Sequence, residues 1–127
     1  MSYRACWDDY GVRFEFYDVL TAQDLMGSSK ELVEDPRFEN IAYELGNFHN
    51  VKSVEVSSTT VRHMAKIDLA ASKRNPNLKI ALVVDSMLML SLTRMWELSG
   101  GGKIWEARIF DNEEAAKLWI GLENFLD

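Results

Sequence analysis

The sequence has few of the residues that secreted, metal-binding and membrane proteins require. Among 127 residues there are one cysteine, Cys6, and two histidines, His49 and His63. A single cysteine cannot form a disulfide within the chain, and the two histidines have no close-spaced partner ligand. No run approaches the roughly 18 apolar residues of a membrane span, and the first residues lack the apolar core of a signal peptide. We therefore expect a cytoplasmic protein without a metal site, a cofactor or an integral membrane segment.

Positive charge is also scarce, because 14 lysines and arginines face 20 carboxylates and give a net charge of −6. Nucleic acids and anionic membranes select proteins with a basic surface, so we expect neither to be the main partner. One stretch gathers several basic residues, and we interpret it as the solvated face of a helix. Its members are Arg62, Lys66, Lys73, Arg74 and Lys79.

Catalytic signatures are missing as well. The sequence holds no Gly-x-Gly-x-x-Gly, Walker or Gly-x-Ser-x-Gly pattern. The run Gly100-Gly-Gly-Lys103 lies after a predicted helix and before a predicted strand, whereas a phosphate loop needs the opposite order. Cys6 alternates with strand-like neighbours and has no evident base, so we expect it to be buried and unreactive. These observations predict a protein that is not an enzyme.

The most informative segment that is present covers residues 79–98. Residues 79–84 are apolar on both faces of an extended strand, which is typical of a parallel sheet covered by helices on both sides. A helix follows at once over residues 86–99, and three glycines end it. This pair of elements predicts an α/β fold.

The other elements repeat this alternation. Turn residues 8–11 predict a hairpin between two short strands, and capping-box patterns open two helices, at Thr21 and at Asp111. The predicted order is β-β-α-β-α-β-α-β-α, which requires right-handed crossovers and one antiparallel strand. We expect one domain over residues 1–127, with a mixed, mostly parallel sheet of about five strands and four helices. The predicted strands are 3–7, 12–17, 40–45, 79–84 and 104–110, with a loop at 46–50 and an extended connection at 51–56.

Three aspartates lie where a ligand could be bound. Asp68 projects into an apolar helix stripe, so its carboxylate must be paired, hydrogen-bonded or partly solvated. It ties a loop or a backbone amide, or it is a polar contact inside a ligand pocket. Asp85 and Asp111 follow two strands at the sheet edge where α/β proteins bind ligands. They either cap the next helices or form a pair of carboxylates.

The helix over residues 86–99 carries more apolar residues than a core-facing stripe needs. At 100° per residue, the core side holds Leu88, Met89, Leu92, Met95 and Trp96. Met87, Leu90 and Leu98 then point elsewhere. Three exposed apolar residues on a Met-rich helix indicate a surface for a protein partner.

The chain resembles the STAS family, the sulfate transporter and anti-sigma-factor antagonist domains, and more closely the small bacterial antagonist-like or STAS/SEC14-like proteins. The resemblance covers nearly the whole chain and consists of fold and core patterns. Besides the element order, its carriers are Ile41-Ala-Tyr-Glu-Leu45, Val54-Glu-Val-Ser-Ser-Thr-Thr-Val61, Ala65-Lys-Ile-Asp68, Lys79-Ile-Ala-Leu-Val-Val84 and Ile109-Phe-Asp-Asn-Glu-Glu-Ala-Ala116 with Trp119-Ile120.

The resemblance implies a domain that binds a protein or a small ligand and catalyses nothing. In the sigma-antagonist branch, a serine at the start of the helix after the central strand is phosphorylated, usually after Asp and before Ser-Gly. Here the matching region reads Glu55-Val56-Ser57-Ser58-Thr59. It lacks the Asp-Ser step and the glycine, so Ser57 and Ser58 are the candidate phosphoacceptors, and either also serves as the N-cap of the helix.

Two functions therefore follow from the sequence. One is a regulatory domain that works through protein contacts, with a protein partner or as a homodimer. The other, implied by the SEC14-like branch, is a module that holds a small apolar ligand between helix and sheet. Its expected lining is Met87, Leu90, Met95 and Trp96. A chain of this length leaves little volume for a large lipid.

Overall fold

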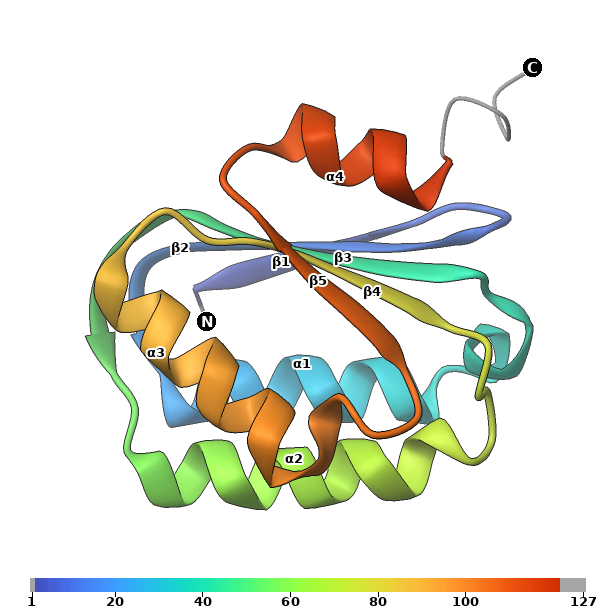
Figure 1. Cartoon of the computed structure of the whole chain (residues 1–127), viewed down its shortest axis with the longest axis horizontal. Coiled ribbons are helices and arrows are strands. Elements are labelled where there is room, and N and C mark those ends of the chain that lie inside the picture. The colour runs from blue at the N-terminus through green and yellow to red at the C-terminus, as the bar shows by residue number, and fades with distance from the viewer. Residues whose placement is uncertain (1, 122–127) are drawn as a thin grey trace.

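A five-stranded sheet separates two layers of helices in the computed structural model, which describes residues 2–121 (Figure 1). The strands lie in chain order, β1 to β5, across the sheet. Their bounds are Tyr3–Trp7 (β1), Gly11–Thr21 (β2), Tyr43–Glu55 (β3), Lys79–Val83 (β4) and Glu106–Phe110 (β5). The helices are Ala22–Glu34 (α1), Ser58–Ser72 (α2), Met87–Trp96 (α3) and Glu113–Ile120 (α4), with short helical turns at Pro36–Asn40 (η1) and Glu97–Gly101 (η2).

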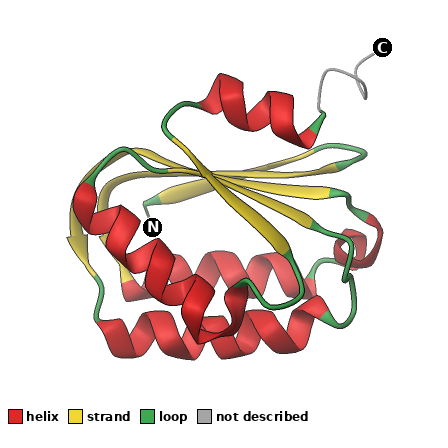
Figure 2. Ribbon diagram, in the orientation of Figure 1, coloured by secondary structure: helices red, strands yellow, loops and turns green. Residues whose placement is uncertain are grey.

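The predicted fold class is confirmed: β1 pairs antiparallel with β2, and the other three pairings are parallel. Helices α1, α2 and α3 cover one face of the sheet, and α4 covers the other (Figure 2). The β1–β2 hairpin turns at Asp8, whose carboxylate accepts hydrogen bonds from the amides of Tyr10 and Gly11. Cys6 is exposed on the edge strand β1, so the expectation of a buried cysteine is wrong.

The third strand differs most from its prediction. Residues 46–50 were expected to form a loop because glycine, asparagine and histidine favour turns. They lie instead within β3, which pairs with β2 from Tyr43 to Glu55. Gly46 fits there because it lies opposite Phe14 on β2 and Leu82 on β4, so packing and ladder hydrogen bonds override local preference.

Side-chain caps fix where each helix begins. Thr21 and Asp24 form the predicted capping box of α1, and Ser57 caps α2 by accepting a hydrogen bond from the Thr60 amide. The caps of α3 and α4 are Ser86 and Asn112. The prediction that Asp85 and Asp111 cap these helices is therefore wrong by one residue in each case.

Alternation along the strands sends side chains to two separate cores. The larger core lies under α1, α2 and α3 and includes Phe14, Phe16, Phe48 and Ile80. The smaller lies under α4 and is built from Tyr43, Leu45, Ala81, Val83, Ala116 and Ile120. Residues 43 and 45 of β3 face α4, so residues 44, 46 and 48 face the three-helix side.

Candidate functional site

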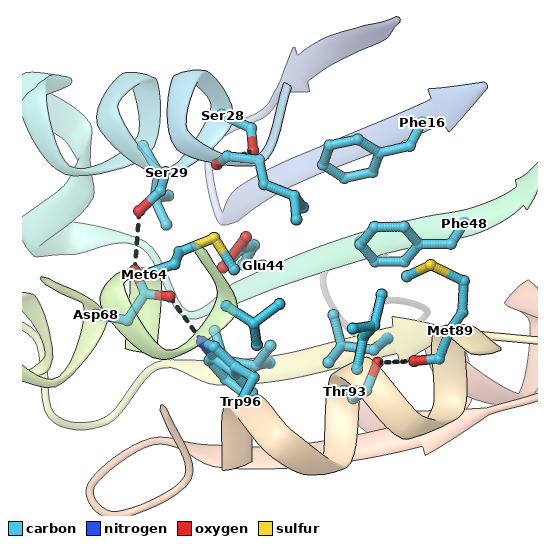
Figure 3. A pocket seen from close by; sticks show the side chains of 17 residues that line it. Phe16, Ser28, Ser29, Glu44, Phe48, Met64, Asp68, Met89, Thr93 and Trp96 are labelled. Atoms are coloured by element: carbon cyan, nitrogen blue, oxygen red, sulfur yellow. Dashed lines mark hydrogen bonds between the residues drawn. The ribbon is translucent and has the colours of Figure 1, made fainter. Parts of the chain in front are cut away.

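A cavity of about 90 Å³, partly open to the surface, lies between α1, α2, α3 and the sheet (Figure 3). Most of its wall is apolar and comes from three strands and three helices. Its lining residues are Phe16, Leu25, Ser28, Ser29, Leu32, Glu44, Gly46, Phe48, Val61, Met64, Asp68, Ile80, Leu82, Met89, Leu92, Thr93 and Trp96. An engineered cavity of about 150 Å³ binds benzene, so this one suits a smaller group.

Asp68 lies at one end of the cavity and has two well-made hydrogen bonds. Ser29 Oγ donates to its Oδ1 at 2.9 Å, and Trp96 Nε1 donates to its Oδ2 at 2.8 Å. Burial raises the pKa of Asp68, and these two hydrogen bonds oppose the rise. Asp68 joins α1, α2 and α3 through side chains, so the expected tie to a loop or a backbone amide is wrong.

A glycine turn holds Trp96 in place for this contact. The backbone of Gly101 in η2 packs closely against the indole of Trp96. A Cβ at this position would overlap the ring, so only glycine fits. Gly100 adopts a φ of 131°, which other residues rarely adopt. Gly101 therefore packs against the Trp96 ring where a side chain would not fit, and Gly100 packs against Leu69 of α2.

Glu44 is the second carboxyl group of the cavity. It lies on the central strand β3, opposite Val12 of β2 and Ile80 of β4, and faces the three-helix side. The side chain is half-buried, and the surface that it keeps lines the cavity. Figure 3 shows it at the centre of the view, between Asp68 and Phe48.

No hydrogen bond to the Glu44 carboxyl occurs within residues 2–121, in contrast to Asp68. Burial and the nearby Asp68 charge raise the pKa of Glu44 to about 8. None of the described lining residues is a lysine, arginine or histidine. At neutral pH Glu44 is therefore mostly protonated, and the surface that it keeps faces the cavity.

The outer face of α3 carries the exposed apolar residues. Met87 is 79% exposed and Leu98 is 86% exposed, as the sequence predicted. Leu88, placed on the core side by angle, is 54% exposed, whereas Leu90 and Met95 are half-buried. The prediction is therefore wrong for Leu88, which lies in the first turn of α3, and for Leu90, which packs partly against the core.

The candidate residues of this helix therefore separate into two groups. Trp96 is buried and lines the cavity, so it cannot belong to an exposed surface. Met87, Leu90, Met95 and Leu98 do not line the cavity. The prediction that Met87, Leu90 and Met95 line a ligand site is therefore wrong for this cavity. A shallow depression on the outer side is formed by Leu90, Ser91, Arg94, Met95, Leu98 and Ser99.

Asp85 lies outside the cavity, so it does not supply a polar group there. Its Oδ2 is 2.5 Å from Nδ1 of His49, at the carboxyl edge of the sheet. Asp111 instead accepts a hydrogen bond from Asn112. Within residues 2–121, no three histidine, cysteine or acidic side chains are grouped to hold a metal ion.

Comparison with known proteins gives the architecture a wider context. No family model and no curated protein sequence matches the chain. Among solved structures, the unphosphorylated anti-sigma-factor antagonist SpoIIAA aligns over 94% of this chain and 97% of its own, with a TM-score of 0.63 and 10% identity. The chain has a STAS-like fold.

Two further structures agree with this assignment. The phosphorylated Bacillus cell fate determinant SpoIIAA covers 92% of this chain and 98% of its own, with a TM-score of 0.59 and 13% identity. An uncharacterised Shewanella loihica protein with a SpoIIAA-like fold covers 93% of this chain and 91% of its own, with a TM-score of 0.57 and 16% identity. The resemblance seen in the sequence of this STAS-like domain is thus confirmed at the level of the fold.

Sequence reasoning missed Glu44, although a signal was available. A carboxylate stands between Tyr43 and Leu45 in a strand that the element order places inside the sheet. In a sheet covered on both faces such a position is normally apolar.

No helix in the described part of this STAS-like domain is both long and apolar enough to cross a membrane.

Proposed function

We propose that this STAS-like domain is a non-enzymatic regulatory protein that works through protein contacts and forms a homodimer in the cytoplasm. The observation that carries the proposal is the apolar outer face of α3, where Met87, Leu88 and Leu98 are exposed. Exposed apolar patches mark interaction sites, and the half-buried Leu90 and Met95 lie between Leu88 and Leu98 in the chain. The similarity of the fold to an anti-sigma-factor antagonist supports a role in regulation.

Light scattering tests the homodimer. The wild type should have the mass of a dimer, and Met87→Glu/Leu98→Glu should have that of a monomer, because two charges would be buried in the interface. Met87→Glu/Leu90→Glu should also shift the mass toward that of a monomer, but to a smaller extent, because Leu90 is half-buried and exposes less surface to a partner. Leu118→Glu is the matched control, because Leu118 is 62% exposed on α4, away from the proposed face. A monomeric wild type, or a dimer indifferent to both double changes, would contradict the proposal.

The second candidate function is the binding of a small apolar ligand, and the cavity under α1, α2 and α3 supports it. Helix α3 lines this cavity with Met89, Leu92 and Trp96 and exposes its other face to solvent. A ligand would therefore contact the same helix that carries the proposed protein surface. Native mass spectrometry of the purified protein should detect a co-purified small molecule, and Gly46→Val, which fills the cavity from β3, should remove it.

Ser57 and Ser58 remain candidate phosphoacceptors. Ser57 is exposed, and its hydroxyl lies at the N-terminus of α2, where a phosphate would meet the positive end of the helix dipole. Phosphorylation would add negative charge at this exposed end of α2. Incubation with lysate and ATP, followed by peptide mass spectrometry of wild type and Ser57→Ala, tests this proposal.

A further inference from the structure

The cavity contains a polar group that the fold does not need. Glu44 occupies a central-strand position flanked by Val12 and Ile80, where an apolar residue would pack without penalty. Its half-buried carboxyl has no hydrogen-bond partner among residues 2–121, and the surface that it keeps lies in the wall of the cavity. A carboxyl in the cavity wall that no described side chain or backbone group satisfies offers a position for a ligand's polar group.

The charges around the cavity restrict which ligand fits. Glu44 and Asp68 are the only ionisable side chains among the described lining residues; α1 contributes Ser28 and Ser29, and α3 contributes Thr93. The hydroxyls of Ser28 and Thr93 already donate to the backbone oxygens of Leu25 and Met89. An anionic ligand would place a negative charge beside Asp68, and it would keep Glu44 protonated, without a cation in the lining to balance the charge, so anions are disfavoured.

Each oxygen of Asp68 accepts one hydrogen bond and can accept another. Once Glu44 is ionised, its two oxygens can also accept, since no group within residues 2–121 donates to them. A primary ammonium has three N–H donors and one positive charge, which matches two facing carboxylates better than a neutral hydroxyl does. The stacked rings of Phe16 and Phe48, 4.5 Å apart, and the aliphatic side chains supply an apolar wall for the rest of the molecule.

We propose that the cavity binds a small amphipathic amine, whose ammonium group lies between the carboxylates of Glu44 and Asp68 and whose apolar part lies against Phe16 and Phe48. The proposal rests on the second candidate function and names the class of its ligand. Because Glu44 must ionise to pair with the ammonium, binding expels its proton to solvent.

NMR titration of the full chain with n-butylamine tests the proposal, with n-butanol and butyrate as neutral and anionic probes of similar size. The readout is the indole N–H resonance of Trp96, which reports on Asp68 directly. The amine stays protonated below pH 9, since alkyl ammonium groups titrate near 10.4 in lysine. Its dissociation constant should fall by up to tenfold per pH unit between pH 6 and 8, as Glu44 loses its proton.

Matched variants separate charge from shape. Glu44→Gln should weaken n-butylamine binding at pH 8 by at least tenfold and remove its pH dependence, while n-butanol binding is kept. Glu106→Gln, at an exposed site on β5, should behave as the wild type. Gly46→Val should abolish the binding of both probes. If Glu44→Gln fails to fold by circular dichroism, the wild-type pH series with the three probes decides the question alone.

Three results would overturn the proposal. If n-butanol binds as tightly as the amine and Glu44→Gln changes neither, the apolar-ligand function stands without an amine. If butyrate binds most tightly, the charge argument is wrong. If no probe shifts the Trp96 resonance, both the amine proposal and the apolar-ligand function fail, whereas the homodimer is tested separately by light scattering.

Discussion

The two faces of the sheet differ in whether their acidic side chains are paired with a cation. On the α4 face, Arg13 of β2 donates to Glu113 of α4 at 2.5 Å and to Glu15 at 3.2 Å, and Asn47 also donates to Glu113. Burial alone would raise the pKa of Glu113, but the hydrogen bonds from Arg13 and Asn47 lower it. On the cavity face, the pKa values of Glu44 and Asp68 are raised, and no cation is present in the lining.

This difference indicates that the α4 face is completed by the chain itself and the cavity face is not. Paired charges and a filled core on the α4 side need nothing further to be stable. An empty volume next to an unpaired acid is costly for folding, and proteins tend to keep such features at functional sites. Both proposed functions use the side of the sheet that α1, α2 and α3 cover.

The largest expected effect comes from removing packing on the α4 face. Leu45 is almost fully buried under α4, so Leu45→Ala should lower the free energy of unfolding by about 2–5 kcal/mol. Urea denaturation followed by circular dichroism measures this change. A loss of less than about 1 kcal/mol would mean that this face is as loosely packed as the cavity side.

Glu44→Gln should sharpen the comparison through pH. The pKa of Glu44 is raised from 4.5 in the unfolded chain to about 8 in the folded protein. Its contribution to stability is thus fully present below pH 4.5 and is lost as the pH rises toward 8. The variant should gain stability relative to wild type by up to about 1.4 kcal/mol per pH unit across this window. Urea denaturation at several pH values measures the free energy of unfolding of both proteins. A difference between wild type and Glu44→Gln that stays constant from pH 5 to 8 would contradict this account. Glu106→Gln, at an exposed site, is the control and should show no such pH-dependent difference from wild type.

Arg13→Met should give the opposite pH dependence. The pKa of Glu113 is lowered from 4.5, so its contribution is present above pH 4.5 and is lost as the pH falls through the folded value. Removing Arg13 leaves the half-buried Glu113 with only Lys117, at 3.6 Å, as a cation, while Glu15 keeps its pair with Arg4. The expected cost is about 1–2 kcal/mol at pH 7. Thermal unfolding at pH 7 and at pH 3 measures the cost, which should shrink at the lower pH. A cost that stays constant would show that the ion pair does not stabilise this face.

The smallest effects should be equal on the two faces. Ser57 caps α2 on the cavity side and Asn112 caps α4 on the other side, each through one side-chain hydrogen bond. Ser57→Ala and Asn112→Ala should each cost about 1 kcal/mol in urea denaturation. Costs that differ widely would show that the two helix layers differ in more than their buried charges.

The sequence predicted the layers of this fold well because its signals are local. The doubly apolar strand at residues 79–84 and the capping box at Thr21 each depend on a few neighbouring residues, and both occur where they were expected. Residues 46–50 were misread, since their strand conformation depends on pairing with the distant β2. Tertiary pairing overrides turn preference in such a segment.

The candidate site was harder to predict, for a physical reason. Asp68 drew attention because it breaks an apolar helix stripe, and it does line the cavity. Glu44 could be singled out only by knowing that β3 is central and which of its faces meets α1, α2 and α3. Trp96 was placed correctly toward the core, but its contact with Asp68 depends on the turn at Gly100 and Gly101.

The central claim is that Glu44, which has no hydrogen-bond partner among residues 2–121, is kept neutral in the wall of the cavity. The most direct measurement is the titration of its side-chain carboxyl carbon by NMR in the ligand-free wild type. The account predicts a midpoint near pH 8, the value to which burial and Asp68 raise the pKa of Glu44. A midpoint near 4.5, the ordinary value for glutamate, would show that the carboxyl is solvated or paired and would contradict the account.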